Sequence, residues 1–434
     1  MIATLKRLAA EAAPSNPLVN PVLSGVAVTC VVGAAMDPAL TQRVQYYPSH
    51  DVVARPQDLA VHGGRAVRGL GGRVAYFPSN TYYPTGGTLA AIFRTPDPVA
   101  QPEHYMNATS FEVEWLTDAP VMEIGYAPTV DRGMRVIVDG HYATAGMILP
   151  DKQASGAVRL DFAGIRKCRH IRFRGRGSIG FVGVNVGPGD MVAPASQTDV
   201  IRVSATGDSF SEGGRGIVEP VDPDGVFPQP LGYWLGWRDV RQTAVSATGY
   251  VSTGSNGDAQ SFGRMNLFDQ IDWWGFTPDV IVCASGYNDA GYIRNKTRVT
   301  GGHYTDALCT PALVAAQAVR TWQKMRDVAP AAPIFVFGPW AGSRGPDEAI
   351  VSVERALSEA FAAWGDPRAW YIPVSVAPLS AESWIWGRGN DSAPRHDGNS
   401  DLYTSADGTH PNDLGGAYLG RRAAEAIRAI LDAL

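Results

Sequence analysis

Three short motifs in the second half of the sequence carry residue types that together suit acyl transfer. They are TGDSF around Ser209, SGYND around Asn288, and DGTHP running from Asp407 through His410. A serine hydroxyl becomes a good nucleophile when an imidazole takes its proton. A carboxylate then fixes the tautomer of that imidazole and stabilises the cation that forms. We therefore predict a catalytic triad of Ser209, His410 and Asp407.

The tetrahedral intermediate of acyl transfer also needs hydrogen-bond donors for its negative oxygen. Loss of one such donor typically costs about 3–4 kcal/mol of transition-state stabilisation. The motifs offer the backbone N–H of Ser209 and the side-chain amide of Asn288, and a glycine N–H is a third candidate. The sequence therefore contains both a nucleophile and the parts of an oxyanion hole.

The elements around these motifs predict a parallel sheet covered on both faces. Short apolar runs alternate with segments rich in alanine and charged residues: 200–203, 280–284, 334–337 and 370–374 for the runs, and 310–328, 346–364 and 415–434 for the segments. Continuous apolar strands alternating with helices are typical of such α/β folds. Ser209 and Asn288 follow the ends of two predicted strands, where sites in these sheets lie.

The first half of the sequence has a different pattern. Between residues 21 and 192, short alternating runs such as SFEVEWL and VRLDF are separated by Gly, Pro, Asn and Asp. This pattern predicts an all-β sandwich or jelly roll. Residues 1–20 are expected to form a short helix and a tail or linker, residues 187–196 a second linker, and residues 197–434 the catalytic domain.

The four motif blocks resemble those of the SGNH (GDSL) hydrolases, a family of serine esterases. The order Gly-Asp-Ser, glycine, Gly-x-Asn-Asp and Asp-x-x-His matches over about residues 197–434. The resemblance implies a flavodoxin-like α/β domain with a parallel sheet. It also implies Ser209 as nucleophile and oxyanion donor, Asn288 as another donor, and Asp407 and His410 as the remaining triad members.

The second block of this family supplies a glycine to the oxyanion hole, and two glycines are candidates here. Gly249, in the stretch SATGY, fits best, and Gly254 is the alternative. Phe210 replaces the leucine of the family name at a hydrophobic packing position. The β-rich first half resembles, more loosely, the sandwich domains that precede some carbohydrate esterases of this family.

Several competing interpretations of the same residues are weaker. Asp208 and Asp289 are expected to cap helices or fix turns. His396, followed by an aspartate, is the main rival of His410. Residues 175–180 match G-x-G-x-x-G, but the following residues cannot form the helix that a dinucleotide site requires. The G-x-S-x-G elbow of the α/β-hydrolases is absent from the sequence.

No metal or cofactor is expected. The sequence lacks H-E-x-x-H, and its cysteines at 30, 168, 283 and 309 have no zinc-ligand spacing. Cys283 lies in an apolar run and is predicted to be a buried thiol, whereas a disulfide between two of the others stays open.

The substrate is expected to be an acyl ester, most simply an acetyl ester, on a carbohydrate. Trp340, Trp384 and Trp386 are candidate platforms for a sugar ring, with core packing as the alternative. Residues 380–406 precede Asp407 and are predicted to form a wall or lid of the cleft. The basic run 166–174 is interpreted first as a strand with one solvated face and, as an alternative, as a grip for an acidic polysaccharide.

Two further hypotheses remain for the function. One is a lipase or thioesterase of the same family. The other is a phage-like spike whose hydrolase domain binds a cell-surface polysaccharide as a receptor, although intact Ser209, Asp407 and His410 argue against a dead site. The net charge of −5 favours neither nucleic acid nor an anionic membrane as partner.

The N-terminal region lacks the pattern of a conventional signal peptide. The start, MIATLKRLAAEAAPSN, has positive charge but no uninterrupted apolar core. The apolar run 21–36 is shorter than the roughly 20 residues that span a bilayer. We therefore expect no membrane span, and either a cytoplasmic location or release by a non-classical route that includes association with a virion.

Overall fold

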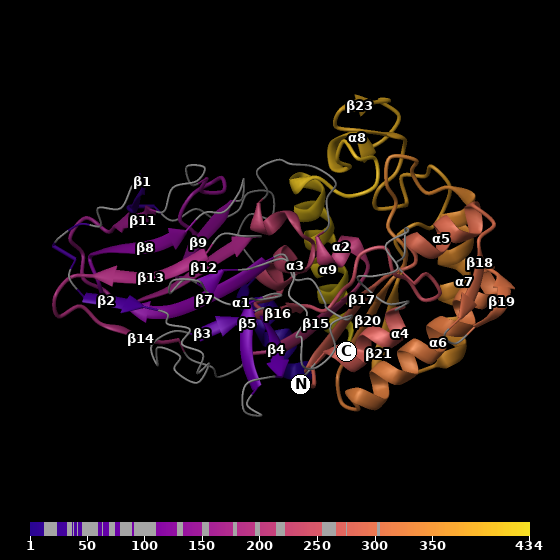
Figure 1. The fold of residues 1–434 in the computed structure, drawn as a ribbon, viewed down its shortest axis with the longest axis horizontal. Coiled ribbons are helices and arrows are strands. Elements are labelled where there is room, and N and C mark those ends of the chain that lie inside the picture. Colours follow the sequence, from indigo (N-terminus) through magenta and orange to yellow (C-terminus); the bar gives the residue numbers. More distant parts are fainter. Residues whose placement is uncertain are drawn as a thin grey trace.

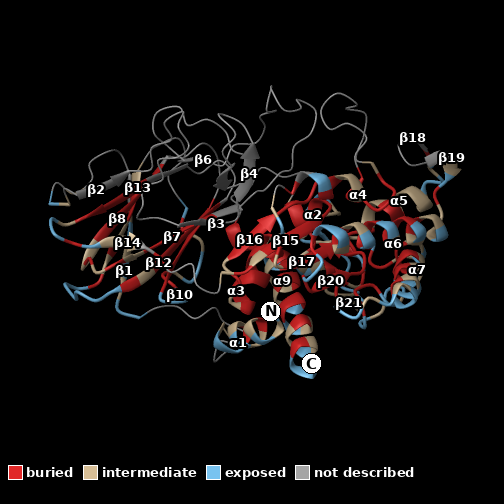
Figure 2. Ribbon diagram, turned by 90° about the horizontal axis from the view of Figure 1, so that it is seen from below, coloured by how far each residue is buried: buried red, intermediate tan, exposed pale blue. Residues whose placement is uncertain are grey.

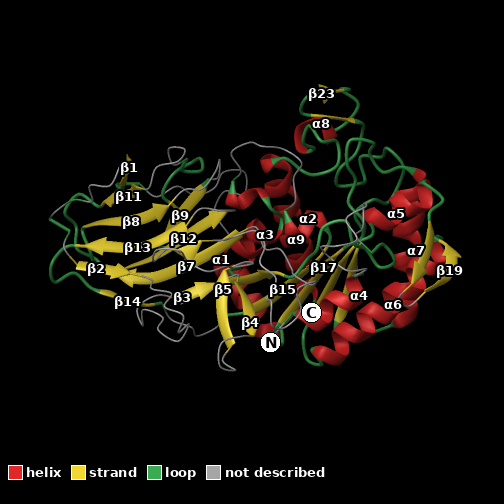
Figure 3. Ribbon diagram, viewed as in Figure 1, coloured by secondary structure: helices red, strands yellow, loops and turns green. Residues whose placement is uncertain are grey.

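The computed structural model has a β-rich part and an α/β part, which lie side by side in Figure 1. The structure describes residues 1–12, 24–32, 37, 39–40, 42–45, 60–62, 64–68, 74–78, 89–90, 110–127, 133–149, 156–176, 180–195, 200–213, 222–253, 266–274, 276–301 and 304–434. Within these ranges, no helix has both the length and the apolar character that crossing a bilayer would require. Figure 3 shows that strands dominate the first part and helices the second.

Two antiparallel sheets face each other in the first part. One has the order β1-β11-β8-β13-β2, with β6 paired to β13, and the other has the order β10-β9-β12-β7-β14, with β3 paired to β7. The first comprises β1 (Ala27–Val32), β11 (Gly156–Asp161), β8 (Val121–Ala127), β13 (Gly180–Val186), β2 (Gln42–Gln45) and β6 (Leu89–Ala90). The second comprises β10 (His141–Tyr142), β9 (Met134–Val138), β12 (Arg169–Arg176), β7 (Ser110–Thr117), β14 (Val192–Pro194) and β3 (Ala60–His62). A hairpin of β4 (Gly64–Arg68) and β5 (Val74–Pro78) accompanies them.

The alternation along β12 sorts its side chains onto two faces. Ile171 and Phe173 are fully buried in the sandwich core, beside Trp115 of β7. Arg172 and Arg174 lie on the opposite face, as the two-residue period of a strand requires. The predicted strand is confirmed, but the prediction that its arginine face is solvated is wrong, because these two arginines are only 7% and 2% exposed.

Buried ion pairs join that arginine face to the second part of the molecule. Glu112 accepts hydrogen bonds from Arg172 and Arg174, and Arg174 also pairs with Asp224. Arg135 of β9 pairs with Asp222. Both aspartates belong to the segment around η1 (Pro223–Gly225), so they come from the α/β part. The sandwich is therefore attached to the α/β part through buried charges, and these charges are not available to grip a polysaccharide.

The second part contains the predicted parallel sheet. Its order is β16-β15-β17-β20-β21, and every neighbouring pair is parallel. The strands are β15 (Arg202–Gly207), β16 (Asp239–Gln242), β17 (Val280–Ala284), β20 (Ile334–Phe337) and β21 (Ala369–Ile372). In chain order this is 2-1-3-4-5, so the topology reverses between β15 and β17, and ligands in such sheets bind outside the carboxyl ends at that point.

Helices cover both faces of this sheet. In Figure 2, α3 and α9 lie on one side of it and α6 on the other. The helical elements are α1 (Ile2–Ala12), α2 (Ser209–Glu212), η1, α3 (Pro228–Leu235), α4 (Leu267–Gln270), η2 (Ile271–Trp273), α5 (Tyr287–Arg294), α6 (Pro311–Val328), α7 (Glu348–Trp364), α8 (Ser400–Tyr403) and α9 (Asp413–Ala433). Two small antiparallel hairpins lie outside this sheet: β18 (Arg298–Gly301) with β19 (Tyr304–Leu308), and β22 (Gly389–Asn390) with β23 (Ala393–Pro394).

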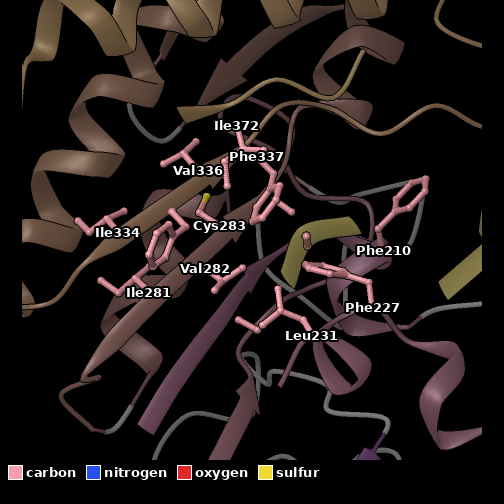
Figure 4. Packing of buried hydrophobic residues seen from close by; sticks show 14 of the residues in the cluster. Phe210, Phe227, Leu231, Ile281, Val282, Cys283, Ile334, Val336, Phe337 and Ile372 are labelled. Atoms are coloured by element: carbon pink, nitrogen blue, oxygen red, sulfur yellow. The ribbon is translucent and has the colours of Figure 1, made fainter. Parts of the chain in front are cut away.

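Local sequence explains where the long helices begin. Thr310, Asp347 and Asn412 each accept a hydrogen bond from a backbone N–H in the first turn of α6, α7 and α9. Such side chains satisfy donors that have no partner within the helix. Between the helices, the apolar side chains of β17 and β20 pack into one core with Phe227 and Leu231, as Figure 4 shows.

Helix α1 packs against the α/β part. Leu5 and Ala9 are buried, and Arg428 of α9 donates a hydrogen bond to the carbonyl of Ala9. The predicted short helix is thus present, and it lies against α3 and α9 of the α/β part. As a result, the two termini lie near each other in Figure 1.

Candidate active site

Ser209 directly follows the tight turn that joins β15 to α2. It is the first residue of α2, and the side chain of Asp208 caps this helix by accepting from the N–H of Phe210. The preceding Gly207 has φ 146°, and a Cβ atom there would lie 1.9 Å from the carbonyl oxygen of Ala284. Only glycine permits this approach of β15 to β17. The turn therefore holds Ser209 at the topological switch point of the sheet.

Asp407 and His410 form a short paired unit ahead of α9. His410 Nδ1 lies 2.6 Å from Asp407 Oδ2, and the N–H groups of Thr409 and His410 donate to Asp407 Oδ1 at 2.8 and 2.9 Å. The hydroxyl of Ser405 donates to the same oxygen at 2.9 Å. Although burial disfavours the charged form, these hydrogen bonds hold the pKa of Asp407 well below its ordinary value. Asp407 is therefore an anion that orients the imidazole.

The imidazole of His410 lies beside the turn that carries Ser209. Its ring centre is 5.8 Å from that of Phe210, the residue after Ser209. Within the described part of the chain, no hydrogen bond joins Ser209 Oγ to His410. Such bonds are often long before a substrate is bound. Phe210 itself is buried in the core, which confirms the predicted packing role of this position.

Asn288 and Asp289, at the start of α5, contact the segment that follows β16. Asn288 Nδ2 donates to the carbonyl of Thr248 at 2.9 Å. Asp289 accepts from three successive N–H groups, those of Tyr250, Val251 and Ser252. The prediction that Asp289 fixes a turn is thus confirmed. These hydrogen bonds from Tyr250, Val251 and Ser252 to Asp289 hold the 245–252 segment against the start of α5.

The structure does not leave Gly249 available as an oxyanion donor. Its N–H donates to the carbonyl of Ser252 at 2.9 Å, so this hydrogen is already used. A Cβ atom at Gly249 would lie within 2.4 to 2.6 Å of the Asp289 carboxylate, which explains the glycine by close packing. The alternative, Gly254, lies outside the described residues.

Two residues earlier, Ala247 has the features that Gly249 lacks. It adopts φ 61°, a left-handed conformation in which glycine is usual and alanine is strained. It is partly exposed, and within the described residues its N–H has no hydrogen-bond partner. The N–H of Val245 donates to the carbonyl of Gly207, so this turn lies next to Ser209. The sequence gives no signal that Ala247 is an oxyanion donor, because the family motif points to a glycine at this place in the site.

A group of buried carboxyl groups lies beneath the nucleophile. Asp208 is fully buried, and burial together with the nearby charges of Asp289 and Glu212 raises its pKa to about 8, despite the opposing hydrogen bond from Phe210 N–H. Burial likewise raises the pKa of Asp289, despite its three backbone donors. The hydrogen bond from Phe210 N–H to Asp208 confirms the expected capping role, and the raised pKa favours the neutral form of this carboxyl group in the folded protein.

Two of the three candidate sugar platforms are core residues. Trp340 is fully buried and stacks on Phe337, with ring centres 5.9 Å apart, and Trp384 is 7% exposed and lies 5.6 Å from Trp340. Their assignment to substrate binding is therefore wrong, because no face of either indole is open. Trp386 is partly exposed and remains a candidate.

The segment 380–406 is folded, and it projects beyond the sheet in Figure 3 as the part that contains β22, β23 and α8. Its end contacts the Asp407 loop, since the Ser405 hydroxyl binds Asp407 and the Ser405 N–H donates to the carbonyl of His410. His396 has a side chain that is 84% exposed and lies near Asp401, whereas His410 is the histidine that contacts the residue after Ser209. The structure therefore favours His410 over its rival.

No group suited to hold a metal occurs in the described ranges, where no three His, Cys, Asp or Glu side chains cluster appropriately. All four cysteines are free thiols, so the open question of a disulfide is answered in the negative. Cys283 is fully buried as predicted, and burial raises its pKa to about 12.

Comparison with known proteins identifies a family for the second half of the chain. Residues 205–418 match the GDSL-like Lipase/Acylhydrolase family. No curated protein matches the sequence.

Similar solved structures share the two-part fold. One is a family two carbohydrate esterase from Cellvibrio japonicus, with 12% identity, 94% of this chain and 99% of that chain covered, and a TM-score of 0.51. Another is the salicylyl-acyltransferase SsfX3 from a tetracycline biosynthetic pathway, with 14% identity, 95% and 99% covered, and a TM-score of 0.53. A third is a family two carbohydrate esterase from Clostridium thermocellum in complex with cellohexaose, with 14% identity, 76% and 95% covered, and a TM-score of 0.50. The α/β part of this chain, over residues 205–418, therefore belongs to the GDSL-like lipase/acylhydrolase family.

Proposed function

We propose that this protein is a serine esterase that removes acyl groups, and specifically acetyl groups, from a carbohydrate. The observation that carries the proposal is the Asp407–His410 pair, joined at 2.6 Å, with its imidazole beside the turn of Ser209. Membership of the GDSL-like family supports ester hydrolysis. The carbohydrate is proposed by analogy with the fold of the family two carbohydrate esterases.

In this mechanism Ser209 Oγ attacks the carbonyl carbon of the ester while His410 Nε2 takes its proton. Asp407 stabilises the imidazolium that forms. The tetrahedral intermediate collapses when its bond to the sugar oxygen breaks, and His410 gives the proton to that oxygen. Water then attacks the acyl-serine with His410 again as base, which releases the carboxylic acid and restores Ser209.

The proposed oxyanion hole combines three donors: the N–H of Ser209, the N–H of Ala247 and Nδ2 of Asn288. The Ser209 N–H opens α2 and has no acceptor among the described residues. Asn288 uses one amide hydrogen on Thr248, and its second amide hydrogen has no acceptor among the described residues. Ala247 replaces Gly249 in this scheme because the Gly249 N–H is bound to Ser252.

The proposal is tested by comparing wild type with Ser209→Ala. Hydrolysis of p-nitrophenyl acetate and release of acetate from an acetylated polysaccharide should both fall, on the order of a million-fold for removal of such a nucleophile. A folded variant that retains a tenth of the wild-type rate would show that Ser209 is not the nucleophile. Faster cleavage of p-nitrophenyl octanoate than of the acetate would instead favour a lipase.

A further inference from the structure

A polar pocket opens beside the catalytic pair and is lined in part by Asp407. It has a volume of about 240 Å³. We call it the arginine pocket; its lining comprises Tyr287, Arg294 and Asn295 of the α5 region, Ser343 and Arg344 after β20, and Asp407, Gly408 and Thr409. Pockets for drug-sized ligands are usually about 300–1,000 Å³. This one therefore suits a single ring or substituent.

The arginine pocket adjoins the proposed catalytic residues through their sequence neighbours. Thr409 precedes His410, and Tyr287 precedes Asn288. The ring of Tyr287 lies 5.3 Å from that of Phe210, and its hydroxyl donates to Thr409 Oγ1 at 3.5 Å. Consecutive Cα atoms are about 3.8 Å apart. A substrate whose ester lies at Ser209 can therefore reach the pocket with an adjacent group.

The loop that carries Arg344 is built onto the Asp407 loop. Ser343 uses both its N–H and its hydroxyl to donate to the carbonyl of Gly408, at 2.9 and 2.7 Å. A Cβ atom at Gly342 would lie within 2.8 to 3.1 Å of the backbone of Gly408 and Thr409. This close backbone contact fixes the position of the loop that carries Arg344 relative to the catalytic pair.

Among the described residues, the charges of the pocket leave one cation without a counter-ion. Arg294 pairs with Asp347, and the carboxylate of Asp407 is engaged by His410 and by its other donors. Arg344 is exposed, and in the described part of the chain it has neither an ion pair nor a hydrogen bond. Its guanidinium can therefore form a bidentate pair with a carboxylate that enters the pocket.

We propose that the arginine pocket binds a carboxylate on the sugar of the substrate, so that the enzyme deacylates an acidic carbohydrate. This inference rests on the proposed esterase function. We assign the pocket to the sugar side of the ester rather than to the acyl side. His410 must protonate the departing sugar oxygen, and the pocket is lined by the three residues that precede His410. The carbonyl oxygen of the acyl group would be bound by the proposed donors of Ser209, Ala247 and Asn288, none of which lines the pocket.

The test uses Arg344→Gln, which removes the charge but keeps a polar side chain. Substrates are an acetylated methyl glucuronoside, the matching acetylated methyl glucoside and p-nitrophenyl acetate. Wild type should prefer the glucuronoside, and R344Q should lower its kcat/KM by about 10- to 100-fold, the size expected for a lost charge-assisted pair. The other two substrates should stay within about two-fold, as they lack the carboxylate that Arg344 binds.

The matched control is Arg355→Gln. Arg355 is an exposed arginine on α7 with no hydrogen bond or ion pair among the described residues, and it lies outside the pocket lining. It should leave all three rates unchanged. Equal wild-type rates on the two sugars, or equal losses on all substrates in R344Q, would overturn the proposal. Preference for a succinylated methyl glucoside would also overturn it, because the carboxylate would then belong to the acyl side.

Calorimetric titration with the unacetylated methyl glucuronoside and methyl glucoside separates this inference from the esterase proposal. If no ester is cleaved, the esterase proposal fails. Binding of the glucuronoside alone, lost in R344Q and kept in R355Q, would still support the carboxylate site. Equal binding of the two glycosides, or binding of neither, would reject that site.

Discussion

Replacing Asp407 with asparagine should inactivate the enzyme while leaving most of its local structure in place. The three donors to Oδ1 of Asp407, from Ser405, Thr409 and His410, can all be accepted by the amide oxygen of asparagine. The other side-chain atom becomes an NH₂ group 2.6 Å from His410 Nδ1. His410 must then accept at Nδ1 and carry its proton on Nε2, where it cannot act as a base toward Ser209.

A wrong tautomer of this kind costs about 10⁴-fold in kcat, or about 5.4 kcal/mol at 1.36 kcal/mol per decade. The lost charge-assisted hydrogen bond should lower the free energy of unfolding by about 1.5–3 kcal/mol. Because folding depresses the pKa of Asp407, its stabilising effect is present above the unfolded pKa near 3.9 and is lost as the pH falls below it. D407N should therefore lose less stability on acidification than wild type.

The assay is hydrolysis of p-nitrophenyl acetate with D407N, beside urea unfolding at pH 3 to 7. Asp391→Asn is the matched control, since Asp391 is an exposed carboxylate of the same segment that contacts Asn412 rather than His410. It should keep its activity within about two-fold, as surface changes do. If D407N were folded and kept a tenth of the wild-type kcat, the assignment of Asp407 as the residue that orients His410 would be wrong.

Three other predictions follow from the same site. Asn288→Ala should lower kcat about 10²–10³-fold with little change in KM, because the amide acts in the transition state; a change in KM alone would make it a substrate contact. Ala247→Gly should preserve activity and raise the free energy of unfolding by up to about 1 kcal/mol, because glycine adopts φ 61° without strain. Gly249→Ala should instead destabilise the fold, because the added Cβ atom would collide with the Asp289 carboxylate. A destabilised A247G variant would contradict this reasoning. The raised pKa of Asp208, about 8, means that folding binds a proton between about pH 4 and 8, so wild-type stability should fall with pH across that window. Asp208→Asn, which resembles the protonated form, should flatten this dependence in urea unfolding and be more stable than wild type at pH 8.5; parallel curves would show that Asp208 is ionised.

The α/β fold and the main candidate residues were accessible from the sequence because their signals are local. The apolar runs 280–284 and 334–337 match β17 and β20 residue for residue. The spacing of Asp407 and His410 places both on one turn, so their pairing needs little from the rest of the fold. The same holds for the capping role of Asp208, which depends only on the N–H groups that follow it.

Tertiary structure alone decided which side chains are open to a substrate. The alternation in β12 correctly predicted two faces, but only the docking of η1 turned the arginine face into buried ion pairs with Glu112 and Asp224. Likewise, an indole suits a sugar face and a core equally well. The packing of Trp384 against Trp340 and Phe337 excludes the first use, and this packing joins segments about 45 residues apart in the chain.

The oxyanion donor was likewise beyond the reach of sequence patterns. A motif with glycine pointed to Gly249, yet a backbone N–H is available only if no other carbonyl accepts it. The carbonyl of Ser252 accepts the N–H of Gly249. The 245–252 segment, which follows β16, is held in place by Asp289, which lies in α5 after β17. Sequence alone therefore determined the residue types, their order and the strand ends that carry them. The folded chain determined which N–H groups, indoles and guanidinium groups remain free, because that depends on contacts between segments far apart in sequence.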